Sequence, residues 1–426
     1  MLISVLVSDT AVLCAMLISG LKFYITVGAN KMAANSHRLI IKNGHIYDPG
    51  NGIDRFGDLA MFKNRIVDVM PDDHTNLMII DADGDLVVPG LIDFHTHIGY
   101  GTSEAAIDAD TIFLPSGVTT VLDAGTKGAA NIDQLAKEVV PSALSTIKCL
   151  INLSPTGIVT LKYGERIDPK YFDEEQMKYC LEKYPDTIIG LKIRIMKDTL
   201  PDYANTGLEP LRRAIEIAEH LGAFIAVHVT DPPCLYSEIV KHLRPGDVLV
   251  HPYQAVGRTI IDENGNLDGS LLEAKKRGVL IDLAGARTNQ NYLIARKAID
   301  QGFKPDIYST DMVRDSVFMK PVFSLPYILS TYKNLGISTA DLIKGCTSIP
   351  ARVMGMEGEI GTLAAGARAD IAIFKEKDVK MEFVDWFDNK IQGNMIFEPR
   401  CTIKDGRLVS LNMEVKQHVI HKLPLV

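Results

Sequence analysis

Two histidines separated by one residue stand at the end of an apolar run in the sequence. The run reads GLIDFHTHIGY from Gly90 to Tyr100, and the pair is His95 and His97. Residues i and i+2 of a β-strand project from the same face, so one ion could reach both imidazoles. Imidazole is a common ligand of zinc and related metals. The pair therefore indicates a metal site, whereas a single histidine at a strand end is more often just hydrogen-bonded.

Polar residues with related chemistry follow other apolar runs. Lys192 lies within IIGLKIRI, His228 is the last residue but one of FIAVHV, His251 follows VLV, and Asp311 follows DIYST. Each has an ordinary alternative, because a lysine stem can lie along apolar surface and an aspartate can cap a turn. Together they exceed the three protein ligands of a single catalytic zinc and suit two ions about 3.5–4 Å apart. A desolvated, neutral lysine could add carbon dioxide, and the two oxygens of the carbamate could bridge both ions.

The remaining histidines fall in other kinds of segment and are interpreted as surface residues. They are His37, His45, His74, His220, His242, His418 and His421.

The runs that carry the candidate ligands predict the parallel strands of a barrel. Helical patterns alternate with them, as in 207–222 and 289–302, where apolar residues recur at helical spacing before a glycine. Eight strand–helix units over roughly 260 residues match a (β/α)8 TIM barrel of the α/β class, with its active site at the C-terminal strand ends. An open doubly wound sheet is the alternative, which the absence of GxGxxG after the first strand disfavours. The eight runs are LIDFHTHI, VTTVLDAG, TIKCLINLS, TIIGLKIRI, FIAVHV, VLVHPY, VLIDLAG and DIYSTD.

The predicted barrel covers residues 89–354, and the segments on either side of it have a different sequence pattern. Short β-type runs separated by Asn-Gly and Pro-Gly turns fill 37–88 and return in 355–410, which predicts one discontinuous β-sandwich with the barrel inserted. Residues 411–426 are expected to form a C-terminal tail. Residues 1–31 are apolar but lack the basic start of a secretory signal and the uninterrupted apolar stretch of a membrane span, so we expect an extension outside the fold.

Composition excludes several classes of protein. The 45 basic and 53 acidic residues give a net charge of −8, without a basic stripe for nucleic acid. The six cysteines are scattered and form no CxxC pair, which suits a reducing, cytoplasmic location. We expect a small-molecule substrate and no nucleic-acid or membrane partner; a homo-oligomer stays open.

The chain resembles the amidohydrolase superfamily, and within it the dihydroorotase-like "deacetylase" branch that includes acetylmandelate-esterase-type enzymes. PGLIDFHTH, GVTTVLDAGTKGAANIDQL, YPDTIIGLKIR, VHVTDPP, GDVLVHPYQ, YSTD and GEIGTLAAGARADIAIF carry the resemblance, which extends over about 37–410. It implies a binuclear metal-dependent hydrolase that cleaves an amide, cyclic amide or ester bond through a hydroxide bridging two divalent ions, with zinc the default. N-acyl amino acid deacetylase, dihydroorotase-like and esterase activities all fit.

The resemblance also implies a role for each candidate ligand. His95 and His97 would bind the more buried ion, His228 and His251 the other. Lys192, carbamylated to N6-carboxylysine by carbon dioxide, would bridge the two ions. Asp311 would bind the buried ion and act as the catalytic proton shuttle.

Two departures from the pattern of close relatives concern the substrate. Relatives generally carry a cysteine after the sixth-strand histidine and Gly-His-Gly after the seventh strand, where this chain has His251-Pro-Tyr and Ala-Gly-Ala-Arg287. Arg287 could clamp an anionic group such as a carboxylate or could point to solvent. Arg194 could form an ion pair or a substrate clamp, and Tyr100 and Tyr163 could line the pocket. Two alternatives to the hydrolase stay open: a catalytically silent scaffold, and a mononuclear deaminase-type enzyme.

Overall fold

The computed structural model describes residues 3–8, 11–18, 21–27, 38–71, 77–165, 167–200, 202–412 and 416–420. Contacts divide the chain into two units, Met1–His37 and Arg38–Val426. In the first unit, three antiparallel strands form a sheet of their own, and the prediction that residues 1–31 lie outside the fold stays a prediction. The strands are β1 (Ile3–Ser8), β2 (Ala11–Ile18) and β3 (Leu21–Val27).

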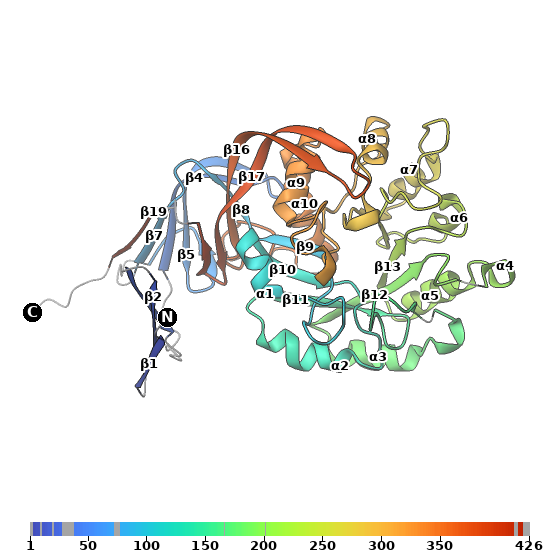
Figure 1. Ribbon diagram of the computed structural model, residues 1–426, viewed down its shortest axis with the longest axis horizontal. Coiled ribbons are helices and arrows are strands. Elements are labelled where there is room, and N and C mark those ends of the chain that lie inside the picture. The colour runs from blue at the N-terminus through green and yellow to red at the C-terminus, as the bar shows by residue number, and fades with distance from the viewer. Residues whose placement is uncertain are drawn as a thin grey trace, which may run out of the picture. The chain divides into compact units, whose positions relative to one another are not determined.

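A parallel barrel forms most of the second unit (Figure 1). Seven strands pair in sequence order in one parallel sheet, and the segment 307–312 takes the eighth place. That segment bridges to the last strand through Asp282 and Ile307 and to the first through Thr96 and Met312. The predicted (β/α)8 barrel is therefore confirmed, with all eight predicted runs in strand positions. The seven strands are β9 (Leu91–Thr96), β10 (Val118–Asp123), β11 (Thr146–Asn152), β12 (Ile188–Ile195), β13 (Phe224–Val229), β14 (Val248–Val250) and β15 (Leu280–Asp282).

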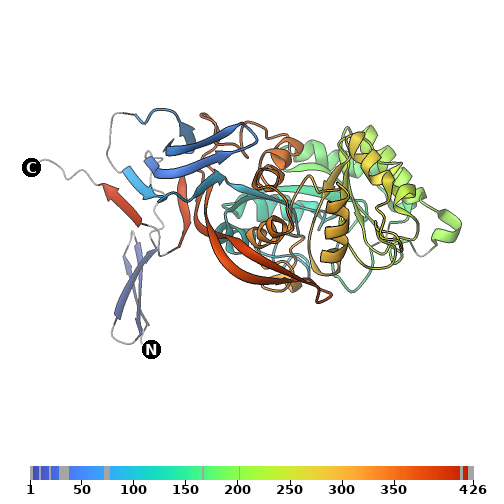
Figure 2. The same ribbon diagram turned by 90° about the horizontal axis from the view of Figure 1, so that it is seen from above.

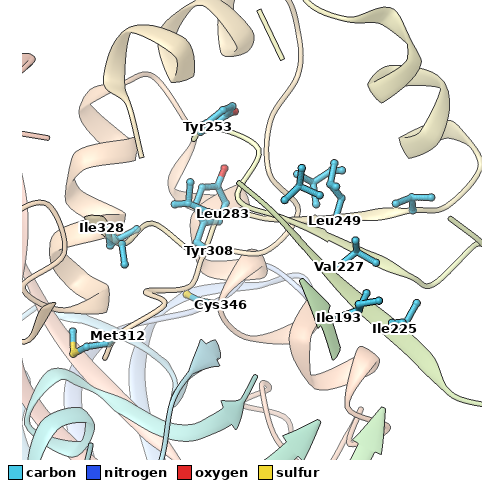
Figure 3. Close-up of a cluster of buried hydrophobic side chains, with 14 of the residues drawn as sticks. Ile193, Ile225, Val227, Leu249, Tyr253, Leu283, Tyr308, Met312, Ile328 and Cys346 are labelled. Carbon is cyan, nitrogen blue, oxygen red and sulfur yellow. The ribbon is translucent and has the colours of Figure 1, made fainter. Parts of the chain in front are cut away.

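Helices cover the outside of the barrel, and the longer ones each bury an apolar stripe against it. In α5 (Glu209–His220), the buried residues include Leu211, Ala214 and Ala218, as the helical spacing predicted. Figure 3 shows part of the resulting core, where Ile193, Val227 and Leu249 from neighbouring strands lie among side chains from the helical layer. The other helices are α1 (Ala109–Phe113), α2 (Ile132–Gln134), α3 (Glu174–Lys183), α4 (Tyr203–Thr206), α6 (Tyr236–Val240), α7 (Gly269–Lys276), α8 (Tyr292–Asp300), α9 (Leu325–Asn334), α10 (Thr339–Gly345) and α11 (Ser348–Val353). No helix among the residues described is long and apolar enough to cross a membrane.

Strands from both flanks of the barrel build a small β domain. They join in one mixed sheet with its own apolar core, in which Ile41 from the first flank and Ile371 from the second are fully buried. β19 lies within the predicted tail 411–426 and pairs with β7, so this part of the tail adds a strand to the sheet. The strands are β4 (Arg38–Asp48), β5 (Ile53–Phe62), β6 (Arg65–Val67), β7 (Leu77–Asp81), β8 (Leu86–Pro89), β16 (Ile371–Val384), β17 (Lys390–Lys404), β18 (Arg407–Leu411) and β19 (Lys416–Ile420).

The long hairpin of β16 and β17 leaves the small domain and runs along the barrel (Figure 2). Its backbone bonds to α9, where the Ser330 hydroxyl accepts from the amide of Phe397 at 2.9 Å. At its tip, the buried carboxylate of Asp385 accepts the Tyr292 amide at 2.8 Å, together with two amides of the turn and the Asn389 side chain. The tip is therefore fixed to the start of α8.

Replacement of Asp385 should measure how much this attachment contributes. Asp385→Ala leaves several buried N–H donors without an acceptor, so we expect a loss of about 2 kcal/mol or more of the free energy of unfolding in urea. Asp388→Asn, three residues along the same turn, removes an exposed ion pair with Lys320 and is the matched control, expected to cost under about 1 kcal/mol. Equal losses in the two variants would contradict the role of Asp385.

Candidate active site

The six predicted ligands lie together at the C-terminal rim of the barrel, and each is at most 7% exposed. They come from five strands or strand ends, as the positions of the eight runs require. Ligand atoms of His95, His251 and Asp311 all lie within 4.8 Å of one another, which is close enough for one cation.

The first group of ligand atoms surrounds one oxygen of Asp311. Its Oδ1 lies 3.7 Å from Nε2 of His95 and 3.5 Å from Nε2 of His97. Burial alone would raise the pKa of Asp311, but the hydrogen bond from His97 and the nearby imidazoles outweigh it and hold the pKa below its usual range. The carboxylate is therefore ionised, as a metal ligand must be.

The second group is an imidazole pair. Nε2 of His251 lies 2.8 Å from Nδ1 of His228, while Nδ1 of His251 donates to the carbonyl of Ala284 at 2.8 Å. His251 therefore presents a lone pair to its neighbour. Burial lowers the pKa of both rings, so both are neutral, and Nε2 of His228 has no partner among the residues described. Two neutral rings with facing nitrogens suit a shared cation, so the donor set fits a metal ion here as well.

Lys192 reaches the first group from the floor of the site. Its Nζ lies 3.0 Å from Nε2 of His95, the nitrogen that also faces Asp311. Burial lowers the pKa of Lys192 to about 8, with Arg194 adding a smaller effect in the same direction, and Asp311 and Asp282 opposing. The lowered pKa increases the neutral fraction of this amine near neutral pH, and the neutral amine is the form that adds carbon dioxide.

Gly125 makes room for the lysine. It follows β10 with φ +83°, and a Cβ there would lie 2.7 Å from Cβ of Lys192 and 2.8 Å from its Cγ. The Gly125 carbonyl accepts from Asn152 at 3.0 Å, and the same amide group bonds to Glu165. Only a glycine meets both the backbone and the space requirement here.

Buried carboxylates that the sequence reasoning missed orient the histidines. Asp282 accepts from Nδ1 of His95 at 3.0 Å. Thr126 contacts Nδ1 of His97 at 2.9 Å and donates to Asp123 at 2.5 Å. These partners fix which ring nitrogen faces the site. Burial raises the pKa of Asp282 to about 7, against the hydrogen bond from Ser309.

A third buried aspartate joins the first and eighth strand positions. Asp93 accepts hydrogen bonds from the amide and the hydroxyl of Thr310, at 3.0 and 2.7 Å, and burial raises its pKa to about 7 despite these bonds. Asp93 stands two residues before His95, so strand alternation places the two side chains on the same face. This spacing could have identified Asp93 from the sequence.

Two of the candidate ligands, Asp311 and His251, adopt left-handed backbone conformations, with φ +51° and +63°.

The four residues proposed from sequence as substrate contacts differ in their surroundings. Arg194 forms an ion pair with buried Glu165 at 2.5 Å, so its charge is already neutralised. Arg287 is half-buried with φ +47°, and its guanidinium has no hydrogen bond or ion pair with any residue described. Tyr100 and Tyr163 are exposed on loops. Their contact with substrate stays a prediction.

The surface interpretation of the other histidines can be checked at three positions. His220 is exposed, and His45 and His242 are half-buried, away from the rim. The side chains of the remaining four, His37, His74, His418 and His421, lie outside the described part of the chain.

Comparison with known proteins identifies the family of the chain. The model of the amidohydrolase family matches residues 86–409. A deacetylase of Brucella anthropi is 29% identical over 325 residues, which cover 76% of this chain and 80% of the relative. A dihydroorotase of Streptococcus thermophilus is 27% identical, over 87% of this chain and 99% of the relative.

Solved structures extend the comparison to the fold. A dihydroorotase superposes with a TM-score of 0.78 at 26% identity, over 88% of this chain and 98% of that one. An adenine deaminase superposes with a TM-score of 0.79, also at 26% identity, over 88% and 99%. The chain belongs to the amidohydrolase family. It is a hydrolase that acts on C–N bonds.

We expect the space that Gly125 leaves beside Lys192 to be essential for metal binding. Gly125→Ala forces a side chain against the lysine stem, so we expect loss of most bound metal, measured by elemental analysis after reconstitution. Gly84→Ala is the matched control, because Gly84 has φ +85° but nothing within 4 Å of its Cβ position. Both variants should lose about 1 kcal/mol or more from backbone strain, but only Gly125→Ala should lose metal. Full metal content in Gly125→Ala would contradict this account of the site.

Proposed function

We propose that this amidohydrolase is binuclear and cleaves an amide, cyclic amide or ester bond of a small anionic molecule. One observation carries the proposal: Nζ of buried Lys192 lies 3.0 Å from Nε2 of His95, and burial lowers the pKa of this amine to about 8, which favours the neutral form that can become a carbamate. A site for one ion would leave this buried amine without a role.

The residues would divide the chemistry among them. Two divalent ions, with zinc the default, would acidify a water molecule and polarise the scissile carbonyl. His95, His97 and Asp311 would hold one ion, His228 and His251 the other, with carbamylated Lys192 between them. Asp311 would take a proton from the attacking water and pass it to the departing nitrogen or oxygen. Burial of all six side chains excludes competing water.

Arg287 supports an anionic substrate. Glu165 already neutralises Arg194, whereas Arg287 is a half-buried residue whose guanidinium has no partner among the residues described. A carboxylate bound by two N–H groups of Arg287 would match this geometry. N-acyl amino acids and cyclic ureides with a carboxylate combine such a group with a hydrolysable C–N bond.

A second candidate is a mononuclear deaminase-type enzyme. The superposition with an adenine deaminase favours it, as does the closeness of His95, His251 and Asp311 around one position. Metal content separates the two: about two ions per chain is expected for the binuclear hydrolase and one for the deaminase. The presence of all six candidate metal ligands argues against a catalytically silent scaffold protein.

The free cysteine thiols are relevant to the cellular compartment of the protein. Cys149, Cys180, Cys234, Cys346 and Cys401 are all buried and free, which supports a reducing compartment such as the cytoplasm.

Loss of the lysine amine should separate binuclear from mononuclear chemistry. Lys192→Ala is expected to lose one or both ions and to reduce hydrolysis by at least about a hundredfold, because the bridging ligand is gone. Short carboxylic acids should partly restore activity by filling the space of the carbamate. A variant that keeps two ions and full activity would refute the carbamate.

Replacement of the free guanidinium should test the substrate class. N-acyl amino acids, cyclic ureides and neutral acyl esters can be compared on the zinc-loaded enzyme. Arg287→Met should raise KM for carboxylate substrates about tenfold or more, through loss of a charged hydrogen bond, and leave neutral esters unchanged. Arg258→Met, at another described arginine, is the control. Equal effects on both substrate classes would contradict the clamp.

A further inference from the structure

One buried amide joins Asp311 to the opposite side of the rim. Nδ2 of Asn289 lies 3.1 Å from Oδ2 of Asp311, and Oδ1 of Asn289 lies 2.7 Å from the hydroxyl of Thr230. Asn289 and Thr230 are each 5% exposed. The three residues therefore form a chain of hydrogen bonds that is largely shielded from solvent.

The direction of these bonds follows from their chemistry. An ionised carboxylate only accepts hydrogen bonds, so the amide must turn its NH2 group toward Asp311. Its carbonyl oxygen then faces Thr230, and the hydroxyl must donate. Loss of the Thr230 hydroxyl would remove the group that orients the amide.

The chain of bonds gives the two oxygens of Asp311 different surroundings. Oδ1 lies among the ring nitrogens of His95 and His97. Oδ2 accepts from Asn289 and lies 3.9 Å from Nε2 of His251. Rotation of the carboxylate out of its present plane would weaken the hydrogen bond from the amide of Asn289.

The three hydrogen-bonded residues come from segments that lie far apart in the sequence. Thr230 follows β13, two residues after His228, and Asn289 ends the turn of Arg287–Asn289 that follows β15. Asp311 lies at the eighth strand position. Three separate segments of the rim thus meet at one amide.

We propose that Asn289, oriented by Thr230, is a positioning residue that holds the carboxylate of Asp311 with one oxygen directed at the ligand position of His95 and His97. This inference rests on the proposed function, because it gives Asp311 the role of ligand and proton shuttle. Asn289 contacts neither the substrate nor the ions in this arrangement. Its effect should appear in metal affinity and kcat, whereas Arg287 on the same turn should act on KM.

Variants of Thr230 test the proposal with the least disturbance. Thr230→Val keeps the shape of the side chain but cannot donate, and Thr230→Ser keeps the hydroxyl. Zinc affinity of the metal-free chain would be measured by competition with a chelator, and kcat and KM after reloading. We expect Thr230→Val to lose about tenfold to a hundredfold in affinity and kcat, with KM within about twofold, and Thr230→Ser to recover most of both.

Asn289→Ala should reproduce or exceed the loss in Thr230→Val. Asn291→Ala is the matched control on the same segment, because the Asn291 side chain caps α8 through the amides of Leu293 and Ile294. It should lower the melting temperature without changing zinc affinity or kcat. Wild-type affinity and kcat in Thr230→Val would overturn the proposal, and so would a rise in KM alone, which indicates a role through the Arg287 turn.

The zinc content of the wild-type protein distinguishes failure of the proposed binuclear function from failure of the positioning role of Asn289. Wild-type protein that binds fewer than two zinc ions contradicts the binuclear function and, with it, the role assigned to Asn289. Wild-type protein that binds two ions, beside variants that match it, contradicts the positioning role alone.

Discussion

The burial of ionisable groups at the rim of the barrel constrains the structure around them. Four imidazoles, an amine and a carboxylate lie in a volume from which water is largely excluded. Removing charged groups from water costs several kcal/mol each unless a partner compensates. Burial lowers the pKa values of His228, His251 and Lys192, which reduces this cost because it favours the uncharged form of each group. The fold therefore holds a set of lone pairs that a cation can use.

Closure of the barrel provides the compensation. Asp282 at the end of β15 reaches His95 on β9, and Asp93 reaches Thr310 at the eighth strand position. These bonds exist only when the segment 307–312 lies between the first and last strands of the sheet. The same hydrogen bonds thus close the barrel and orient the ligands, so stability and chemistry share these side chains.

Much of this site could be predicted from the sequence because strand periodicity is local. His95 and His97 share a face at i and i+2, and the other ligands follow apolar runs whose ends must meet at one rim. The partners could not be predicted in this way. Asp282 lies 187 residues from His95, and Asp93 lies 217 residues from Thr310, so only the closed fold brings them together. The pairing of Arg194 with Glu165 depends on a loop whose path the periodicity does not determine.

The pairing of β8 with β16 has a consequence for how the chain could be rearranged. β8 leads into the barrel, β16 leaves it, and the two are hydrogen-bonded neighbours in the small domain. Pro89, just before the barrel, and Ile371, where the chain has returned to the small domain, are therefore held one strand spacing apart, roughly 4.8 Å. Domains whose ends lie this close tolerate insertion and circular permutation. The chain could therefore be reopened by circular permutation at a loop on the face of the barrel opposite the metal site, with the β16–β17 hairpin still packed on the barrel.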